Sequence, residues 1–442
     1  MIFSSFEFLS FFFIFILSIF YFRQYQKNLI IIFSLFFYLY WNPIYIFLII
    51  YLCLITYFLI KRNINLKTAL VFNFIPLIYF KYSAFILINT NHQILNMISF
   101  TGELPLAISF VSFTTAALII DIKLNKFKEN LNFKDLTEFI SYFPQLIAGP
   151  ILRAKELVPK LKNNIVFNKQ NIKFGLLLFL IGFIKKVFLA DNISEIINPF
   201  FENPELYQSK DLIKSFLLFP LQIYFDFSGY VDMALGVSYF LGIELPINFN
   251  KPYQSYSLTE FWRRWHITLS SWFRDYLYIP LGGSKVSKIR LFFNLVFTMT
   301  IAGLWHGASF NFILWGFING LVLSFEKFFI KNDVKSRSRL ILTCFIIFNL
   351  WVLFRIESFN TTYSYFTILY SNLNEIFILE NIIILFLLIF FIYLQKFEDH
   401  SLLKKVTHKV NFAFLVTFTS TIILFGLTMA LGSSEEFIYF QF

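Results

Sequence analysis

Long apolar runs alternate with short polar stretches along almost the whole chain. A helix needs about 20 apolar residues to cross a membrane, and most of the runs approach or reach that length. The pattern predicts spans at residues 5–22, 28–41, 43–60, 67–88, 104–121, 172–190, 212–242, 290–305, 308–327, 339–356, 380–395 and 412–431. We therefore predict an all-α polytopic membrane protein with about 11–13 transmembrane helices plus re-entrant segments. All of residues 1–442 are expected to form one membrane domain.

Two stretches depart from the plain spanning pattern. The 212–242 run is too long for one span, and it contains residues that interrupt or polarise a helix: Pro220, Asp226, Ser228, Gly229 and Asp232. It predicts a broken or paired helix that faces the protein interior. The 135–153 stretch, with P-Q-L-I-A-G-P at 144–150, joins two basic loops. It predicts a re-entrant segment, because irregular backbone is tolerated in a membrane only where protein or water covers it.

Charged residues alternate between successive loops. The loops rich in Lys and Arg are 23–27, 61–67, 122–134, 153–173, 251–290, 327–339 and 396–409. The loops at 89–103 and 357–380 and the tail after Gly432 contain acidic residues and no Lys or Arg. Because basic residues collect in cytoplasmic loops, the pattern predicts that both termini lie outside and that the basic loops face the cytoplasm.

Composition agrees with a membrane protein. The chain is 58% hydrophobic and 14% charged, whereas soluble domains carry roughly a quarter charged residues. The net charge of +11 follows from the same bias toward basic cytoplasmic loops, so nucleic-acid binding is not expected. Cys53 and Cys344 lie within apolar runs and are expected to be packing residues. The first apolar run lacks a basic start and a small-residue cleavage site, so we expect it to be retained.

His306 is an ionisable residue between two predicted spans, in the segment I-A-G-L-W-H-G-A-S-F-N at 301–311. Ionisable residues at membrane depth are rare and usually serve a function. An imidazole can act as a general base that takes a proton from an acceptor hydroxyl during acyl transfer. Gly307 would let a substrate approach the backbone closely. The alternative is a histidine that only packs against Trp305.

A second histidine, His266, follows a run of aromatic and basic residues, F-W-R-R-W-H-I-T-L-S-S-W at 261–272. Helical spacing would place Trp262, Trp265 and His266 on roughly one face. One interpretation is an active site built from two histidines. The other is an interfacial helix that tryptophans anchor and in which the histidine is structural.

Basic residues around His266 suit phosphate binding. Arg263, Arg264, Arg274 and Lys285 could bind the phosphates of a nucleotide-bearing donor, although their place in a cytoplasmic loop explains them equally well. The sequence G-G-S-K at 282–285 lacks the spacing of a P-loop and predicts a turn.

The remaining polar residues suggest weaker roles. The segment F-D-F-S-G-Y-V-D at 225–232 predicts either a proton path or a cap on a helix break at Gly229, and the second is favoured. No cluster has the spacing of metal ligands, so no metal is expected. Of the other histidines, His400 and His408 are expected to be solvated in a basic loop, and His92 has no assigned role.

Several segments together resemble the membrane-bound O-acyltransferase family, and in particular its bacterial branch of alginate and peptidoglycan O-acetyltransferases. The matching segments are F-P-Q-L-I-A-G-P-I at 143–151, F-D-F-S-G-Y-V-D-M-A at 225–234, L-P-I-N-F-N-K-P-Y at 245–253, F-W-R-R-W-H-I-T-L-S at 261–270, R-D-Y-L-Y-I-P-L-G-G at 274–283, G-L-W-H-G-A at 303–308 and the terminal F-I-Y-F-Q-F. They cover most of the chain from about residue 104 onward, in the family's order. Ala107 and Thr115 depart mildly from it, standing where relatives often have Gly and Gln.

The resemblance implies a helical ring around a central catalytic channel, with His306 as the catalytic histidine and His266 at the other signature position. We assign substrate binding to residues near these histidines in the sequence: Trp305, Trp265, Arg263, Arg264 and Tyr276. The implied acetyl donor is acetyl-CoA or a similar cytoplasmic thioester. The implied setting is the bacterial cytoplasmic (inner) membrane, with multiple spans in contact with lipid.

The acceptor is expected to be an extracytoplasmic polysaccharide, most of all peptidoglycan, served by a separate periplasmic acetyltransferase of the SGNH type. Alginate or another exopolysaccharide is an alternative acceptor, and D-alanyl transfer to teichoic acid is a second enzymatic alternative. A proton-coupled transporter is the alternative from a different class, but no internal repeat of the kind common in transporters is obvious.

Overall fold

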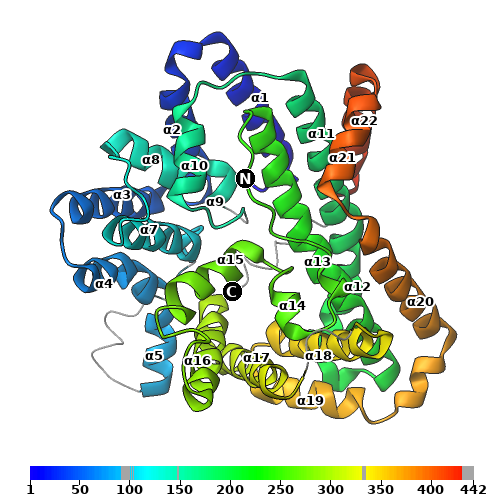
Figure 1. Cartoon of the computed structure of the whole chain (residues 1–442). Helices are drawn as coiled ribbons and strands as arrows, with labels where there is room; N and C mark the ends of the chain where they lie inside the picture. The colour runs from blue at the N-terminus through cyan, green and yellow to red at the C-terminus, as the bar shows by residue number, and fades with distance from the viewer. Residues whose placement is uncertain (91–99, 101, 103, 147–148, 331–334, 431–442) are drawn as a thin grey trace. The chain divides into compact units, whose positions relative to one another are not determined.

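The computed structural model describes residues 1–90, 100, 102, 104–146, 149–330 and 335–430. These residues form helices joined by short turns, with no β-strand among them (Figure 1). The predicted all-α class is therefore confirmed. Contacts divide the chain into two compact units, described separately below. The prediction of one membrane domain over the whole chain stays a prediction.

The first unit contains the described residues of Met1–Leu180, Tyr230–Pro246 and Asn411–Ser420. Its helices lie mostly in the N-terminal part of the chain: α1 (Phe6–Tyr21), α2 (Gln26–Trp41), α3 (Ile46–Lys61), α4 (Leu66–Leu77), α5 (Ser83–Thr90), α7 (Ile108–Lys123), α8 (Phe133–Ser141), α9 (Phe143–Leu146), α10 (Ala154–Lys162) and most of α11 (Lys169–Phe183). The 135–153 stretch, predicted to be re-entrant, forms α8 and α9 as two short helices with irregular backbone at residues 149–153.

Phenylalanines form the core of the first unit at its N-terminal end. The Phe143 ring meets the rings of Phe11 and Phe15 edge-on, with 5.3 Å between centroids in each pair. Phe8 and Phe37 form a further edge-on pair at 6.2 Å. Because edge-to-face contacts stabilise aromatic clusters, the Phe-rich sequence supplies packing inside the protein as well as a surface for lipid.

The second unit contains the described residues of Ile181–Gly229, Ile247–Val410 and those from Thr421 on. Its helices are α12 (Asp191–Glu202), α14 (Leu258–Trp262), α15 (Ile267–Phe273), α16 (Lys288–His306), α17 (Phe310–Phe329), α18 (Arg337–Arg355), α19 (Phe359–Leu369), α20 (Leu379–Leu394) and α21 (His400–Lys409). Helices α13 (Ser209–Phe240) and α22 (Phe412–Ala430) contribute residues to both units. Within this second unit, two of the described segments adopt the wider π-helical turn, Ile184–Ala190 and Arg274–Tyr278.

Six helices of the described chain are long and apolar enough to cross a membrane. They are Pro43–Lys61, Leu66–Leu87, Lys288–His306, Phe310–Phe329, Arg337–Arg355 and Leu379–Phe397. Two bent pairs, Phe6–Tyr21 with Arg23–Trp41 and His400–Lys409 with Phe412–Thr428, raise the number to eight if each pair is one span. The protein is therefore a multi-pass membrane protein, as predicted.

These six to eight candidate spans are fewer than the twelve apolar runs from which membrane spans were predicted. The predicted spans at 5–22 and 28–41 correspond to two helices that meet at an angle of 107°. The predicted span at 104–121 corresponds to α7, which has 16 residues and is buried along most of its length. An apolar run can thus be used to fill the protein interior as well as to face lipid, and run length alone does not separate the two uses.

The prediction of a broken helix at 212–242 is wrong, because α13 is continuous from Ser209 to Phe240. Pro220 lies inside it, and the Tyr253 hydroxyl donates a 2.7 Å hydrogen bond to the Pro220 carbonyl oxygen. Gly229 serves a close helix contact rather than a break. A Cβ atom at Gly229 would lie 2.8 Å from the carbonyl oxygen of Gly182 in α11, so only glycine permits this approach.

Candidate functional site

His306 is the last residue of α16, directly before the tight turn into α17. Gly307 continues in an extended conformation, and Ser309 caps α17 by accepting a 3.4 Å hydrogen bond from the Phe312 amide. Helices α16 and α17 therefore run antiparallel beside each other (Figure 1). The position of His306 is fixed by how closely these two helices pack.

Glycines allow that close packing. A Cβ atom at Gly303 would lie 2.1 Å from the Phe312 carbonyl oxygen, and one at Gly316 would lie 2.2 Å from the Met299 carbonyl oxygen. One turn later, a Cβ at Gly320 would lie 2.5 Å from Val296 Cα. Gly316 and Gly320 form a G-x-x-x-G pattern, which brings helix backbones together in membranes where hydrophobic driving force is weak.

The His306 ring lies within an aromatic enclosure and is 5% exposed. Its centroid is 4.9 Å from that of Trp305, 5.0 Å from Phe354 and 5.4 Å from Trp315. The ring of Phe312 is nearly parallel to it at 6.4 Å. These contacts fix the plane of the imidazole without enclosing it completely, because it also borders a cavity.

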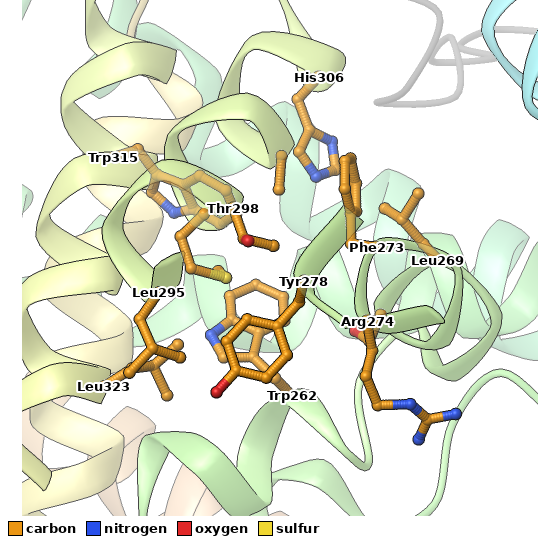
Figure 2. A pocket seen from close by; sticks show the side chains of 13 residues that line it. Trp262, Leu269, Phe273, Arg274, Tyr278, Leu295, Thr298, His306, Trp315 and Leu323 are labelled. Carbon is orange, nitrogen blue, oxygen red and sulfur yellow. The ribbon is translucent and has the colours of Figure 1, made fainter. Parts of the chain in front are cut away.

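That cavity, referred to below as the His306 cavity, has a volume of about 140 Å³. It is lined almost wholly by apolar surface, from Trp262, Leu269, Ser270, Phe273, Arg274, Tyr278, Leu295, Thr298, Met299, Ala302, His306, Trp315 and Leu323. Figure 2 shows His306 at one end of this set, with Arg274 reaching away from the others. Cavities of about 150 Å³ bind ligands the size of benzene, so a small organic group fits here.

The segment before the cavity does not form the single helix that the spacing at 261–272 predicted. Helix α14 ends at Trp262 and α15 begins at Ile267, and His266 between them has a positive φ of 43°. Asn248 holds this turn: its backbone oxygen accepts from the Ile267 amide, and its side-chain oxygen accepts from the amide and hydroxyl of Thr268. The sequence does not reveal the break because it depends on a partner about 20 residues away.

Helix α17 anchors the short α14. The buried Glu326 carboxylate accepts hydrogen bonds from the backbone amides of Leu258 and Thr259, at 2.6 and 2.9 Å. A carboxylate at a helix N-terminus is favourable because the amides there lack helical partners. The Trp262 indole N–H donates to Asn319 Oδ1 at 3.1 Å. These bonds hold Trp262 against the His306 cavity.

His266 is 1% exposed and does not line the cavity. Its ring lies edge-on to Phe227, at 4.8 Å, and to Trp305, at 6.2 Å. Trp305 therefore contacts both predicted histidines. Burial lowers the pKa of His266 to about 3, so its imidazole is neutral at physiological pH.

The residues predicted to bind substrate lie in different settings. Trp265 is 1% exposed within an aromatic cluster that includes Trp351, at 4.9 Å. Arg264 donates to Glu260 at 2.7 Å, whereas Arg263 is exposed. Tyr276 packs against Trp272 at 5.3 Å. None of these four lines the His306 cavity, and their roles in binding stay predictions.

The sequence interpretation missed several residues of the cavity, among them Tyr278, Thr298 and Trp315. Thr298, Ala302 and His306 are spaced by four residues along α16, so a polar residue on the same helical stripe as the histidine was the available signal. Arg274, considered above for phosphate binding, does line the cavity. The sequence G-G-S-K at 282–285 forms turns, as predicted.

The carboxylate of Asp226 takes part in a buried ion cluster. Lys186 Nζ lies 2.7 Å from Asp226 Oδ1 and 2.8 Å from Asp191 Oδ1, and all three side chains are buried. The predicted cap on a helix break at Gly229 is thus wrong, because the break does not exist. No group of metal-ligating side chains occurs among the described residues.

Comparison with known proteins gives the family of this chain. The sequence model of the MBOAT family, the membrane-bound O-acyltransferases, matches residues 33–366. The chain belongs to this family. The match covers both the 261–272 segment and the α16–α17 turn that carries His306.

Several curated proteins match this chain over more than half of its length. A peptidoglycan O-acetyltransferase of Helicobacter pylori is 36% identical over 382 residues, which are 76% of this chain and 72% of the relative. A probable alginate O-acetylase AlgI of Pseudomonas aeruginosa is 35% identical over 394 residues, or 84% and 75%. A teichoic acid D-alanyltransferase of Bacillus subtilis is 32% identical over 266 residues, or 56% and 64%. The family match and these relatives confirm the prediction of a membrane O-acetyltransferase.

Proposed function

We propose that this enzyme moves an acetyl group from a cytoplasmic thioester, such as acetyl-CoA, toward the hydroxyl groups of an extracytoplasmic polysaccharide. The observation that carries the proposal is the position of His306, which borders an apolar cavity of about 140 Å³ in a protein of this family. An acetyl group needs a small apolar space next to a base, and the His306 cavity offers both.

In the proposed reaction, His306 acts as the general base. Its imidazole takes the proton of an acceptor hydroxyl while the hydroxyl oxygen attacks the thioester carbonyl carbon. The carbon–sulfur bond then breaks, and the thiolate leaves with the proton that His306 releases. When His306 holds this proton, its positive charge lies at the carboxyl end of α16, where backbone carbonyl groups favour positive charge.

His266 has a different proposed role. A pKa of about 3 makes it too weak a base to take a proton near neutral pH, since proton transfer works best when the pKa lies near the operating pH. We assign it to positioning: as a neutral ring it packs against Trp305, which contacts His306. The same low pKa argues against a role for His266 in passing a proton.

The other predicted binding residues are proposed to act outside the cavity. Arg263 is exposed and available to the phosphates of acetyl-CoA, while Arg264 and Tyr276 support the segment around it. Trp305 and Trp265 would hold the two histidines in place. The basic 251–290 loop supports a cytoplasmic side for the acetyl donor, and the proposed location of the enzyme is the bacterial cytoplasmic membrane.

Peptidoglycan is the favoured acceptor, supported by the likeness to the Helicobacter pylori enzyme over three quarters of the chain. An exopolysaccharide such as alginate is the second candidate, because the Pseudomonas aeruginosa relative matches a larger share of the chain at nearly the same identity. In both cases a periplasmic acetyltransferase of the SGNH type is the proposed partner that completes transfer to the polymer.

The experiment that tests this function follows the acetyl group into each polymer. Cells that contain and cells that lack the gene are supplied with labelled acetate, and base-labile label is counted in peptidoglycan, teichoic acid and exopolysaccharide fractions. We expect loss from peptidoglycan alone in the deletion strain. Loss from another fraction would identify that polymer as the acceptor, and no loss from any fraction would contradict acetylation of a polysaccharide.

A further inference from the structure

Thr298 has a buried hydroxyl group that borders the His306 cavity. The residue is 6% exposed, and its Oγ1 atom has no hydrogen-bond partner among the described residues. A threonine within a helix ordinarily satisfies its hydroxyl on a backbone carbonyl of the preceding turn. Thr300, two residues later in the same helix, does so, with a 2.8 Å bond to the Val296 carbonyl oxygen. Thr298 is therefore distinct from its neighbour.

Trp315, which also lines the cavity, contains a second buried polar atom without a partner among the described residues. Trp315 is 1% exposed, and its indole N–H has no partner within the described chain. The other tryptophan of the cavity, Trp262, has its N–H bonded to Asn319. Buried polar groups without a partner are unfavourable, so two of them in residues that line an otherwise apolar cavity are consistent with a bound molecule that supplies hydrogen-bonding atoms.

The positions of these residues constrain the shape of that molecule. Thr298 precedes His306 by eight residues, which corresponds to about 12 Å along the helix axis. Ala302 lies between them on the same stripe and presents only a methyl group. A molecule that reaches both Thr298 and His306 is consequently extended along α16. Figure 2 shows Thr298 between His306 and the Tyr278–Trp262 side of the set.

We propose that Thr298 is a specificity-determining residue, whose hydroxyl binds a carbonyl or amide oxygen in the extended arm of the acyl donor. This inference rests on the proposed function. The acetyl group lies at His306, the apolar part of the arm passes Ala302, and the next hydrogen-bond acceptor meets Thr298 Oγ1. The enzyme thus selects thioesters by the distance between the acyl carbon and a polar atom of the arm, and a simple thioester without that atom is a poor donor.

The test compares steady-state kinetics of the purified full-length enzyme with acetyl-CoA as the varied substrate. Thr298→Val keeps the shape of the side chain and removes the hydroxyl, whereas Thr298→Ser keeps the hydroxyl. Thr300→Val is the matched control, because it removes a hydroxyl from the same helix that already has a partner. We expect Thr298→Val to raise KM about three- to tenfold with little change in kcat, since the lost contact is remote from the reacting atoms. Thr298→Ser and Thr300→Val are expected to stay within about twofold of the parent enzyme.

A second measurement uses a short acetyl thioester that lacks an amide, with which Thr298→Val and the parent enzyme should have the same kcat/KM. The inference is overturned if Thr298→Val leaves the KM for acetyl-CoA unchanged, or if Thr300→Val raises it equally. His306→Ala is assayed alongside. If only this variant is inactive while Thr298→Val is normal, the proposed function stands and the inference fails. If His306→Ala is fully active, the proposed function itself fails.

Discussion

The two histidines of this enzyme differ in what they can reach. His306 borders the cavity, whereas His266 is enclosed by Phe227, Trp305 and the turn that Asn248 holds. An imidazole must contact a substrate hydroxyl to act as a general base. The geometry therefore separates the proposed base, His306, from a neutral histidine that supports it.

The buried His266 should make the stability of the protein depend on pH. Its pKa is about 3 in the folded state and about 6.5 when unfolded. Below pH 6.5 the unfolded state binds the additional proton, so stability falls as the pH is lowered from 6.5 toward 3, by at most about 1.4 kcal/mol per pH unit. His266→Gln should weaken this decline, as measured by thermal unfolding in detergent between pH 7 and pH 5. His408 is exposed, so His408→Gln serves as the control and should keep the parent's dependence of stability on pH. The same pH dependence in the parent, His266→Gln and His408→Gln proteins would contradict the buried neutral state of His266.

At the scale of single residues, the sequence pointed to His306 but not to the cavity that it borders. A single ionisable residue between apolar runs is visible in the sequence, because its cost in a membrane implies a purpose. Thr298, Tyr278 and Trp315 come together only when α16, α17 and the 274–278 segment pack, so their grouping depends on tertiary contacts.

Among the elements, the α16–α17 hairpin determines where His306 lies. Gly316→Ala would bring a Cβ atom to 2.2 Å from the Met299 carbonyl oxygen and 2.8 Å from Thr300 Cα, both backbone atoms that cannot move alone. Overpacking of this kind costs about 1–3 kcal/mol. We expect a lower unfolding midpoint in detergent and a fall in acetyl transfer, because the helices separate at the cavity.

The control for this variant lies on the same helix. Phe325 is 56% exposed on α17, and Phe325→Leu should leave both the midpoint and the activity near the parent values. A Gly316→Ala protein with parent stability would show that the helices are not held at this distance.

The ion cluster at Lys186 should contribute strongly to the stability of the second unit. Lys186→Met would remove the positive charge that lies within 2.8 Å of the buried Asp226 and Asp191 carboxylates, and removing one partner of a buried ion pair costs about 3–5 kcal/mol. The Lys214–Glu380 pair offers a matched comparison, since Glu380 is largely exposed. Glu380→Gln should cost less than about 1 kcal/mol. Similar losses of unfolding free energy for the two variants would contradict the buried cluster.

Two elements were predicted with the wrong continuity. Helix α13 runs unbroken through Pro220 and Gly229, and these residues did not by themselves end the helix. The 261–272 segment breaks, and Asn248 holds the turn at His266. This second break depends on a residue distant in sequence, whereas propensity and spacing report only on neighbours.

For the whole molecule, hydrophobicity predicted the class and the family resemblance predicted the chemistry. Six predicted spans correspond to helices that can cross a membrane. The number of spans was less predictable, because helices such as α7 are apolar in order to be buried in protein. A sequence rich in Phe does not distinguish a surface that faces lipid from one that faces another helix.

The most direct test of the account measures base-labile O-acetate on purified peptidoglycan from four strains: parent, deletion, His306→Ala and His408→Ala. His408 is an exposed histidine outside the proposed site, so its variant controls for the substitution itself. With equal amounts of protein in the membrane, we predict that acetate is lost in the deletion and His306→Ala strains and kept in His408→Ala. Parent levels of acetate in His306→Ala, together with loss in the deletion strain, would contradict the central claim that His306 carries the transfer.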